Sequence, residues 1–358
     1  MKKIAIMTAG GDCPGLNAAI KAVVMSAHNK DVQVLGVLDG YKGFVEGWYK
    51  ELTPKDVENI ELLGGTILGS SNKECPFYYL VDKTNMKYVD KTDEAIANIK
   101  KQGVEGLIVV GGDGTLNSAK VISERGLPTV GIPKTIDNDM AASNPTIGFD
   151  TAVGNVVDAI NKVRSTADSH RRVIVVEIMG RTSGYLTLYG GFAGCADIIL
   201  LPEQDYDLDG VCEKVKEVAS RRRSVIVAVA EAAKELGKAE TVAKMINDSF
   251  EKKRYGGIAE KLADQIEAKT GIECRYVALG HVQRGGTPNH NDIITASMLG
   301  SYAYELLTMG EYGYIVGVDG EELKKMEFPK DEINARLLDL NTHPLVKTAK
   351  AVGVYFGE

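Results

Sequence analysis

The hydrophobic positions of this chain fall into short, nearly uninterrupted runs rich in Val and Ile, most of them followed by a glycine turn or a helical pattern. Runs that do not alternate with polar residues are typical of parallel strands covered on both faces. The pattern predicts strands at Ile4–Thr8, Val34–Leu38, Gly106–Val110, Thr129–Ile132, Val173–Ile178, Ile198–Leu201, Val225–Ala230, Tyr276–Leu279 and Tyr314–Val318. Amphipathic spacing predicts helices that include Leu16–His28, Thr92–Gln102, Leu116–Glu124 and Thr151–Thr166.

This repeated order of strand, turn and helix predicts an α/β protein with mainly parallel sheets. A chain of 358 residues is long enough for two domains. The stretch 141–145 is a candidate crossing between lobes, and the polar, helix-like stretch 232–254 is a candidate insertion. Ligands of open α/β sheets bind outside the carboxyl ends of the strands, so we expect the site in the loops that follow them.

The charge and the cysteine content exclude several classes of binding partner and structural site. A net charge of −7 and a pI near 5.5 argue against a general nucleic-acid or anionic-membrane surface. The five cysteines form no CxxC pair, so they indicate neither a disulfide framework nor a zinc site, and a reducing cytoplasm fits best. No signal-peptide region follows Met1, and no apolar stretch approaches the roughly 20 residues of a membrane helix. We therefore expect a cytoplasmic protein.

Two glycine-rich loops follow predicted strands, GGDCPG at 10–15 and GGDGT at 111–115. Glycines let backbone N–H groups approach a phosphate closely, and a following helix adds partial positive charge. Asp113 is suited to hold Mg²⁺ beside the phosphates. Neither loop is a Walker A motif or a dinucleotide fingerprint. A tight strand-to-helix turn explains one such loop equally well, but two in one chain favour phosphate binding.

A third loop, PKTIDND at 133–139, carries two carboxylates, Asp137 and Asp139, at a strand end. Such a pair suits metal binding together with general base catalysis, which typically contributes roughly 10²–10⁴-fold to rate. An Asx-rich turn is the alternative for this sequence in isolation. The neighbouring loops favour the chemical interpretation.

Cations occur at the ends of two predicted strands. Arg172 precedes and Arg181 follows one of them, while Arg275 precedes the other and HVQRGG, at 281–286, follows it. Because the arginine fork matches phosphate oxygens, the pattern indicates a phosphorylated substrate. A single exposed arginine is usually only solvated, so the inference depends on the joint pattern.

Other charged residues carry weaker signals. A lone histidine such as His281 more often has a structural role than contacts a ligand. Glu231, at a strand end, could accept hydrogen bonds from sugar hydroxyls, but a carboxylate that is simply exposed to water explains its position nearly as well. The clusters at 221–223 and 252–254 are expected at helix ends, where cations suit the helix dipole, and we assign them no catalytic role.

Together, these segments closely resemble those of the 6-phosphofructokinases. GGDGT alone is shared with lipid and NAD kinases, an alternative that the strand-end arginines and His281 disfavour, whereas TIDND, MGR and HVQRGG together are highly specific. The matches follow the family's order: GGDCPGLNAAI (10–20), GGTILGS (64–70), GGDGT (111–115), PKTIDND (133–139), MGRTSGYL (179–186) and GHVQRGG (280–286).

The resemblance implies a phosphofructokinase-like fold of two α/β/α sandwich (Rossmann-like) domains with the substrates in the cleft between them. It implies that residues 1–145 plus about 283–345 form a larger domain that binds the phosphoryl donor. Residues of about 146–282 plus 346–358 then form a smaller domain that binds the sugar phosphate.

The implied reaction is the Mg²⁺-dependent transfer of the ATP γ-phosphoryl group to the 1-hydroxyl of fructose 6-phosphate, giving fructose 1,6-bisphosphate. In the family's pattern Asp137 is the general base, Asp139 assists at the metal and Asp113 holds Mg²⁺. Gly11 and Thr135 contact the transferring group, and Arg181 stabilises its charge in the transition state. The implied donor-binding residues are Gly11, Asn72, Lys73, Asp113, Gly114, Thr115 and Lys134. The implied substrate-binding residues are Thr135, Asp137, Asp139, Arg172, Met179, Gly180, Arg181, Glu231, Arg275, His281 and Arg284.

Single residues, compared with their counterparts in the family, indicate the identity of the phosphoryl donor and the presence of an oligomer. In the family, arginines matching Arg172 and Arg275 reach in from a neighbouring subunit, which implies a homo-oligomer, a dimer or a tetramer. Gly114 resembles ATP-using members, whereas Lys134 resembles pyrophosphate-using ones. An aspartate at 114 would crowd and repel the α-phosphate of ATP, so the glycine favours ATP and leaves pyrophosphate as the alternative. A non-catalytic sugar-phosphate sensor is disfavoured because Asp113, Asp137 and Arg181 are all present.

The effector pocket of the allosteric bacterial members is poorly matched. Lys21, Met25 and Pro54 stand where those members carry arginines, although Arg164 and Arg222 match. Asp197 replaces a glutamate that helps bind the effector's metal. Fewer bidentate donors weaken phosphate binding, so allosteric regulation by ADP or phosphoenolpyruvate is not expected.

Overall fold

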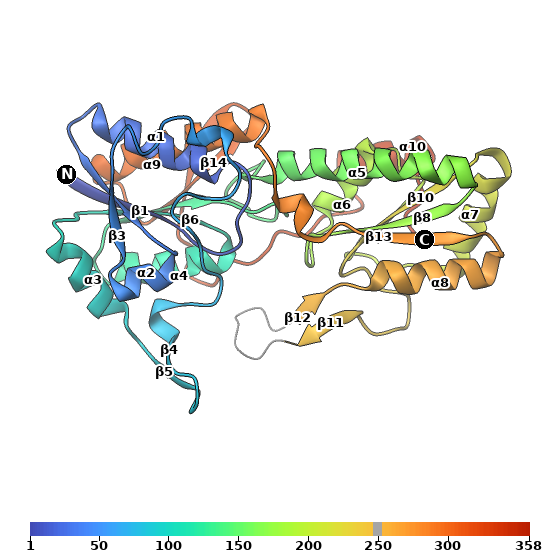
Figure 1. Ribbon diagram of the computed structural model, residues 1–358, viewed down its shortest axis with the longest axis horizontal. Helices are drawn as coiled ribbons and strands as arrows, with labels where there is room; N and C mark the ends of the chain where they lie inside the picture. The colour runs from blue at the N-terminus through green and yellow to red at the C-terminus, as the bar shows by residue number, and fades with distance from the viewer. Residues whose placement is uncertain (246–252) are drawn as a thin grey trace.

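The structure is a computed structural model that describes residues 1–245 and 253–358. Two lobes lie side by side, and each has a central sheet with helices on both faces (Figure 1). The predicted α/β class with mainly parallel sheets is confirmed, because most strand pairs within both large sheets are parallel. None of the helices in the described ranges combines the length and apolar character needed to cross a bilayer.

The sheet of the first lobe has seven strands in the order β15-β14-β7-β6-β1-β2-β3. Its two edge strands, β3 and β15, pair antiparallel with their neighbours, and the inner pairs are parallel. The strands are β1 (Lys3–Thr8), β2 (Gln33–Val37), β3 (Tyr49–Leu52), β6 (Leu107–Gly111), β7 (Thr129–Pro133), β14 (Tyr314–Asp319) and β15 (Glu322–Glu327).

Alternate side chains of the inner strands supply two cores. Ile4 and Ile6 of β1 pack with α1 (Leu16–His28) and α9 (His290–Thr308), whereas Ala5 and Met7 face the opposite layer. That layer contains α2 (Tyr41–Glu46), α3 (Thr92–Lys101) and α4 (Asp113–Glu124). The inner strands are thus covered on both faces, which explains why they appear in the sequence as continuous apolar runs.

The sheet of the second lobe has four parallel strands in the order β13-β8-β10-β9. These strands are β8 (Val173–Ile178), β9 (Ile198–Leu200), β10 (Val225–Ala230) and β13 (Cys274–Ala278). One face packs on α5 (Phe149–His170), α6 (Tyr185–Ala193) and α10 (Pro344–Ala351), and the other on α7 (Leu208–Arg221) and α8 (Ile258–Thr270).

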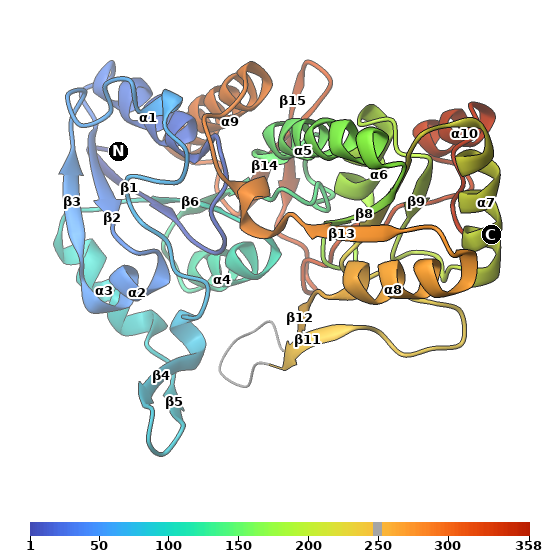
Figure 2. The ribbon, with the colours of Figure 1, turned by 45° about the vertical axis from the view of Figure 1, so that its right-hand side comes forward.

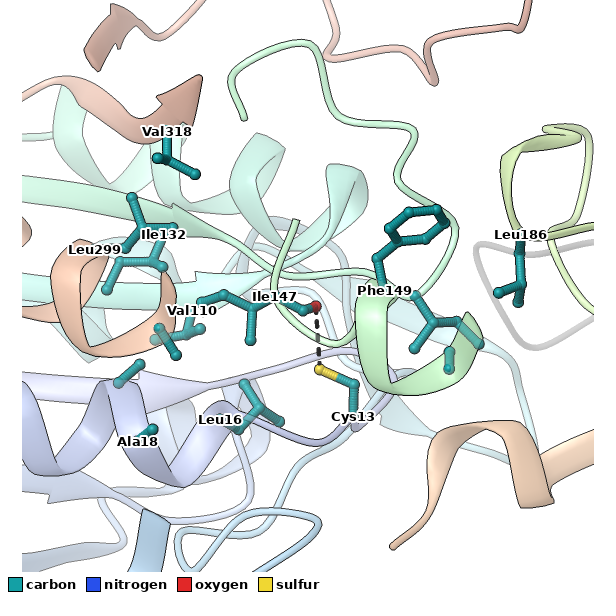
Figure 3. Packing of buried hydrophobic residues seen from close by; sticks show 14 of the residues in the cluster. Cys13, Leu16, Ala18, Val110, Ile132, Ile147, Phe149, Leu186, Leu299 and Val318 are labelled. Atoms are coloured by element: carbon teal, nitrogen blue, oxygen red, sulfur yellow. Dashed lines mark hydrogen bonds between the residues drawn. The ribbon is translucent and has the colours of Figure 1, made fainter. Parts of the chain in front are cut away.

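The junction between the lobes is packed at the amino-terminal end of α5. Figure 3 shows Leu16 and Val110 of the first lobe in the same buried cluster as Phe149 and Leu186 of the second. Nearby, the Cys13 thiol donates to the carbonyl of Ile147 at 3.4 Å. The predicted crossing at 141–145 lies within the segment that connects β7 to α5.

Two surface hairpins depart from the predicted pattern (Figure 2). The helix-like prediction for 232–254 is wrong, because β11 (Val242–Met245) pairs antiparallel with β12 (Lys253–Tyr255). Glycines with positive φ at 237, 256 and 257 flank this hairpin and disfavour a continuous helix. Lys253 and Arg254 therefore lie in a strand instead of at a helix end, and Lys252 lies outside the described residues. Arg221 ends α7 as expected.

The second hairpin follows a short helical turn, η2 (Pro76–Tyr78), and joins β4 (Tyr79–Asp82) to β5 (Lys87–Val89). It projects away from the first lobe in Figures 1 and 2. Further short turns are η1 (Ile60–Leu62) and η3 (Gly280–Arg284), of which η3 follows β13.

Candidate active site

A cavity of about 470 Å³ lies at the carboxyl ends of β1, β6 and β7. It combines the three loops singled out in the sequence with Arg181 from the second lobe. Of the residues expected at the site, those that line it are Gly11, Asn72, Asp113, Gly114, Thr115, Lys134, Thr135, Asp137, Asp139, Arg181 and Arg284.

The first glycine loop is packed against two cations. A Cβ built on Gly11 would lie 2.0 Å from Nη1 of Arg284, so a glycine is required while that arginine stays in place. Lys134 is buried and its ammonium donates to the carbonyl of Gly11. Burial lowers the pKa of Lys134, and the positive charges of Arg284 and Arg181 add to the effect. The loop therefore lies directly beside positive charge, as an anion site requires.

The second glycine loop leads into α4, which begins at Asp113. The N–H of Gly114 donates to Asp113 Oδ1 at 2.8 Å, and Tyr41 Oη donates to the carbonyl of Thr115 at 2.6 Å. A Cβ built on Gly114 would meet nothing within 4 Å, so open space lies above this position. The amino-terminal end of α4 thus faces the cavity with its partial positive charge.

The third loop buries two carboxylates, Asp137 and Asp139. Between them Asn138 adopts the left-handed conformation, with φ of 52°, and its Oδ1 accepts from the N–H of Thr146 at 3.1 Å. Burial, followed by the charges of Asp137 and Asp113, raises the pKa of Asp139 to about 7. The site thus concentrates negative charge near the glycine loops.

Arg181 reaches this group from the loop after β8. Its guanidinium Nη1 lies 3.7 Å from Asp113 Oδ1. Its backbone N–H donates to Glu231 Oε1, beyond β10, at 2.9 Å, and φ at Arg181 is 50°. Burial raises the pKa of Glu231 to about 7, and the charge of Asp137 contributes. Four strand ends from two sheets, those of β6, β7, β8 and β10, therefore converge on one acidic cluster with an arginine in it.

The remaining expected residues divide into two groups. Met179, Gly180 and Glu231 lie beside Arg181 at the carboxyl ends of β8 and β10, and the N–H of Met179 donates to Gln283 Oε1 at 3.2 Å. Lys73 and His281 are exposed and fall outside the lining formed by the described residues.

Arg172 and Arg275 lie at the opposite, amino-terminal ends of β8 and β13. A six-residue strand separates them from the Arg181 end by about 20 Å. Glu273 binds both: its Oε2 lies 2.7 Å from Arg172 Nε and its Oε1 lies 2.6 Å from Arg275 Nη2. Within one chain, Arg181 and Arg284 therefore line the cavity, whereas Arg172 and Arg275 lie at the far end of their sheet.

Several lining residues were not identified from the sequence. Tyr41, Phe77 and Asn117 extend the cavity beyond the glycine loops, and residues 332–335 form a further wall. The N–H of Ile333 donates to Asn117 Oδ1 at 2.9 Å. No glycine loop or charge pattern marks the 332–335 segment, so only the three-dimensional contacts reveal it.

A family model described as "Phosphofructokinase" matches residues 3–307. This chain belongs to the phosphofructokinase family. Over 363 residues it is 41% identical to "ATP-dependent 6-phosphofructokinase 2" of Clostridium perfringens, covering 100% of this chain and 99% of the relative. A phosphofructokinase of Bacillus subtilis named as ATP-dependent is also 41% identical, over 90% of this chain and 91% of its own length. The "Pyrophosphate--fructose 6-phosphate 1-phosphotransferase" of Dictyoglomus thermophilum is 41% identical as well, over 97% of this chain and 98% of its own.

Solved phosphofructokinases share the fold. The phosphofructokinase of Saccharomyces cerevisiae matches with a TM-score of 0.79 and 30% identity, covering 91% of this chain. This chain spans only 44% of that yeast chain. A pyrophosphate-dependent phosphofructokinase from Marinobacter aquaeolei matches with a TM-score of 0.80 at 16% identity, over 100% of this chain and 93% of its own, which shows the fold alone. The predicted phosphofructokinase-like architecture is thus confirmed.

Proposed function

We propose that this phosphofructokinase transfers the γ-phosphoryl group of ATP to the 1-hydroxyl of fructose 6-phosphate, with Mg²⁺ as cofactor. The observation that carries the proposal is the convergence of Asp113, Asp137 and Arg181 with the glycine loops on one cavity. Phosphoryl transfer depends on positioning and on electrostatic stabilisation, and these groups supply both.

Each residue has a role in the proposed reaction. Asp137 takes the proton from the 1-hydroxyl of the sugar. The hydroxyl oxygen then bonds to the γ-phosphorus of ATP, while the bond between that phosphorus and the oxygen that leaves with ADP breaks. Gly11 and Thr135 contact the moving group, and Arg181 stabilises the negative charge on its oxygens. Met179, Gly180, Glu231, His281 and Arg284 bind the sugar phosphate, with Asp139 beside the metal.

The acidic cluster suits a magnesium ion. Burial and then the charges of Asp137 and Asp113 raise the pKa of Asp139, and such a group of neighbouring carboxylates favours the presence of a divalent cation. Mg²⁺ commonly binds through one or two carboxylates plus substrate phosphates, so Asp113 is its proposed protein ligand. The ion supplies charge neutralisation on the donor phosphates when bound.

The shape of the cavity supports a nucleotide donor. Its lining continues beyond the phosphate-facing loops to Tyr41, Phe77 and Ile333, which offer apolar surface to a nucleoside. Gly114 leaves the adjoining space open. Relatives at 41% identity named as ATP-dependent agree with this assignment.

Pyrophosphate is the second candidate donor, and one observation favours it. Lys134 is a buried cation beside the Gly11 carbonyl, which suits a small, highly charged donor, and one relative at 41% identity is named for pyrophosphate. A coupled assay of fructose 1,6-bisphosphate formation with each donor tests both. A higher kcat/KM with pyrophosphate would reject ATP as the preferred donor, and no turnover with either would reject the function.

We also propose that the chain acts as a homo-oligomer, a dimer or a tetramer, in which Arg172 and Arg275 serve the site of a neighbouring subunit. Their distance from Arg181 within one chain supports this arrangement. The edge strand β13 leaves Tyr276 44% exposed, and Val282 after it is 67% exposed, so apolar surface is available for contact. In this scheme residues 1–145 plus about 283–345 bind the donor, and about 146–282 plus 346–358 bind the sugar phosphate.

A further inference from the structure

A segment near the carboxyl end of the chain, residues 332–338, runs from the donor side of the cavity to the second lobe. Its first four residues line the cavity. Ile333 is held on α4 by two hydrogen bonds with Asn117, one from its N–H at 2.9 Å and one to its carbonyl at 3.4 Å. The segment lies beyond the residues that the family model matches.

Arg336 connects this segment to the acidic loop. Its backbone N–H donates to the carbonyl of Asp139 at 2.5 Å, and its Nη2 donates to the carbonyl of Asn138 at 2.9 Å. Asn138 has φ of 52°, a conformation that a non-glycine residue keeps only when its surroundings hold it. Arg336 alone thus donates hydrogen bonds to two consecutive carbonyls of the loop that carries Asp137.

Arg336 also connects the segment to the second lobe. Its guanidinium lies 4.7 Å from the ring centroid of Tyr185, within cation–π range. The Ser183 hydroxyl donates to the carbonyl of Arg336 at 3.4 Å. Both residues follow Arg181 closely, so Arg336 lies between the loop that carries Arg181 and the loop that carries Asp137.

A carboxylate reinforces the connection. Glu203 Oε1 accepts from the N–H of Gly184 at 2.8 Å and from the N–H of Leu338 at 3.0 Å. One oxygen thereby joins the loop after β8 to the end of the 332–338 segment.

We propose that Arg336 is a positioning residue that holds the Asp137 loop and the Arg181 loop in register across the cleft. The inference rests on the proposed function. Arg336 is not among the described residues that line the cavity, so it acts through Asn138, Asp139 and Tyr185. The alignment of the base Asp137 with the attacking hydroxyl affects the rate of the chemical step more than it affects substrate binding. A displacement of about 1 Å can lower that rate about 10²-fold.

Steady-state kinetics of the full chain with ATP, Mg²⁺ and fructose 6-phosphate tests the inference. We expect Arg336→Ala to lower kcat about 10- to 100-fold, with both KM values within about threefold of wild type. Arg336→Lys keeps a cation and an aliphatic stem without the planar fork, and should recover part of the lost kcat. Lys330→Ala is the matched control, because it removes an exposed positive charge from the same stretch and should keep wild-type kinetics.

Two results would overturn the inference. A lower Tm with unchanged kcat would indicate a purely structural role, and a raised KM for fructose 6-phosphate with unchanged kcat would indicate direct contact with the substrate. If Arg336→Ala does not fold, Arg336→Lys decides: a kcat several-fold below wild type with both KM values kept supports positioning, and wild-type kcat rejects it. No turnover by the wild-type chain would instead reject the proposed function itself.

Discussion

The guanidinium of Arg181 lies 3.7 Å from the carboxylate of Asp113, and this ion pair spans the two sheets. Arg181 follows β8 of the four-stranded sheet, whereas Asp113 begins α4 after β6 of the seven-stranded sheet. Both side chains remain about one-third exposed, so the pair adds little to stability. In the proposed reaction, the arginine can therefore exchange the carboxylate for a phosphoryl oxygen at small cost when a donor and Mg²⁺ bind at Asp113.

Asp137→Asn tests the proposed base. The amide has nearly the same shape but does not accept the hydroxyl proton, so we expect kcat to fall by at least about a hundredfold with little change in substrate binding. Kinetics and isothermal titration with fructose 6-phosphate measure the two effects. Asp264→Asn, on the exposed side of α8, is the control. A loss of less than tenfold would assign the base to another group.

Gly114→Asp tests donor selection. The new side chain enters the open space above α4, where it would repel the α-phosphate of ATP but leave room for pyrophosphate. We expect kcat/KM for ATP to fall at least about tenfold, which corresponds to about 1.4 kcal/mol, while the ratio of pyrophosphate to ATP activity rises. Gly154→Asp, in α5, where a Cβ also meets nothing and φ is not positive, is the matched control. Equal losses with both donors would argue against a role of position 114 in selection.

Subunit sharing has a direct test in mixed oligomers. Asp137→Asn and Arg172→Ala should each be nearly inactive alone. If Arg172 serves the neighbouring site, refolding an equal mixture forms hybrids with one intact site, and about a quarter of wild-type activity should return. Recovery should appear only after the subunits have exchanged. Continued inactivity of a mixture shown to contain hybrids would place Arg172 outside the partner's site.

The raised pKa of Glu231, about 7 because of burial, predicts how stability depends on pH. A carboxyl whose native pKa exceeds its unfolded value favours folding only when protonated, so its contribution is complete below the unfolded pKa and is lost as pH rises through the native one. We expect the Tm of the ligand-free protein to fall between about pH 5 and about pH 7.5, by less in Glu231→Gln than in wild type. Glu124→Gln, exposed at the end of α4, should keep the wild-type slope. Identical slopes for all three proteins would contradict the assignment.

Effector response is expected to be weak. A cavity of about 690 Å³ beside α7 contains Asp197 and Arg222, but these two residues already form an ion pair of 2.6 Å. Lys21 is likewise paired, with Glu61 at 2.5 Å. Millimolar ADP or phosphoenolpyruvate should therefore change the activity at subsaturating fructose 6-phosphate by less than about twofold. Strong activation or inhibition would show that the cations present in this pocket are enough to bind the phosphate of an effector.

Local sequence patterns were enough to predict two inner strands and one helix to the residue, and the other inner strands to within one or two residues. Val173–Ile178 and Val225–Ala230 match their predictions because both faces are buried and every position except Glu177 is apolar. Leu16–His28 also matches, with Gly15 at φ of 103° directly before it. The edge strand β15 was not predicted because its side chains are largely exposed and charged, so no apolar run marks it.

For the site, the sequence could predict the loops but not their complete surroundings. Glycines and carboxylates after parallel strands mark the Gly11, Asp113 and Asp137 loops, and the parallel order brings them to one edge of the sheet. Ile333 and Arg336 reach the same place through hydrogen bonds to Asn117 and Asn138, far away in the chain. Such contacts follow from the tertiary path and leave no local signature.

The wall formed by residues 332–335 has a consequence for the order in which the site is completed during translation. The glycine loops, the acidic loop and Arg181 all leave the ribosome well before this segment does, and folding during synthesis proceeds from the amino-terminal side. A nascent chain that stops short of Glu332 therefore carries the glycine loops, the acidic loop and Arg181 while one wall of the cavity is still missing. The cavity therefore gains this wall only after its glycine loops, its acidic loop and Arg181 have been synthesised.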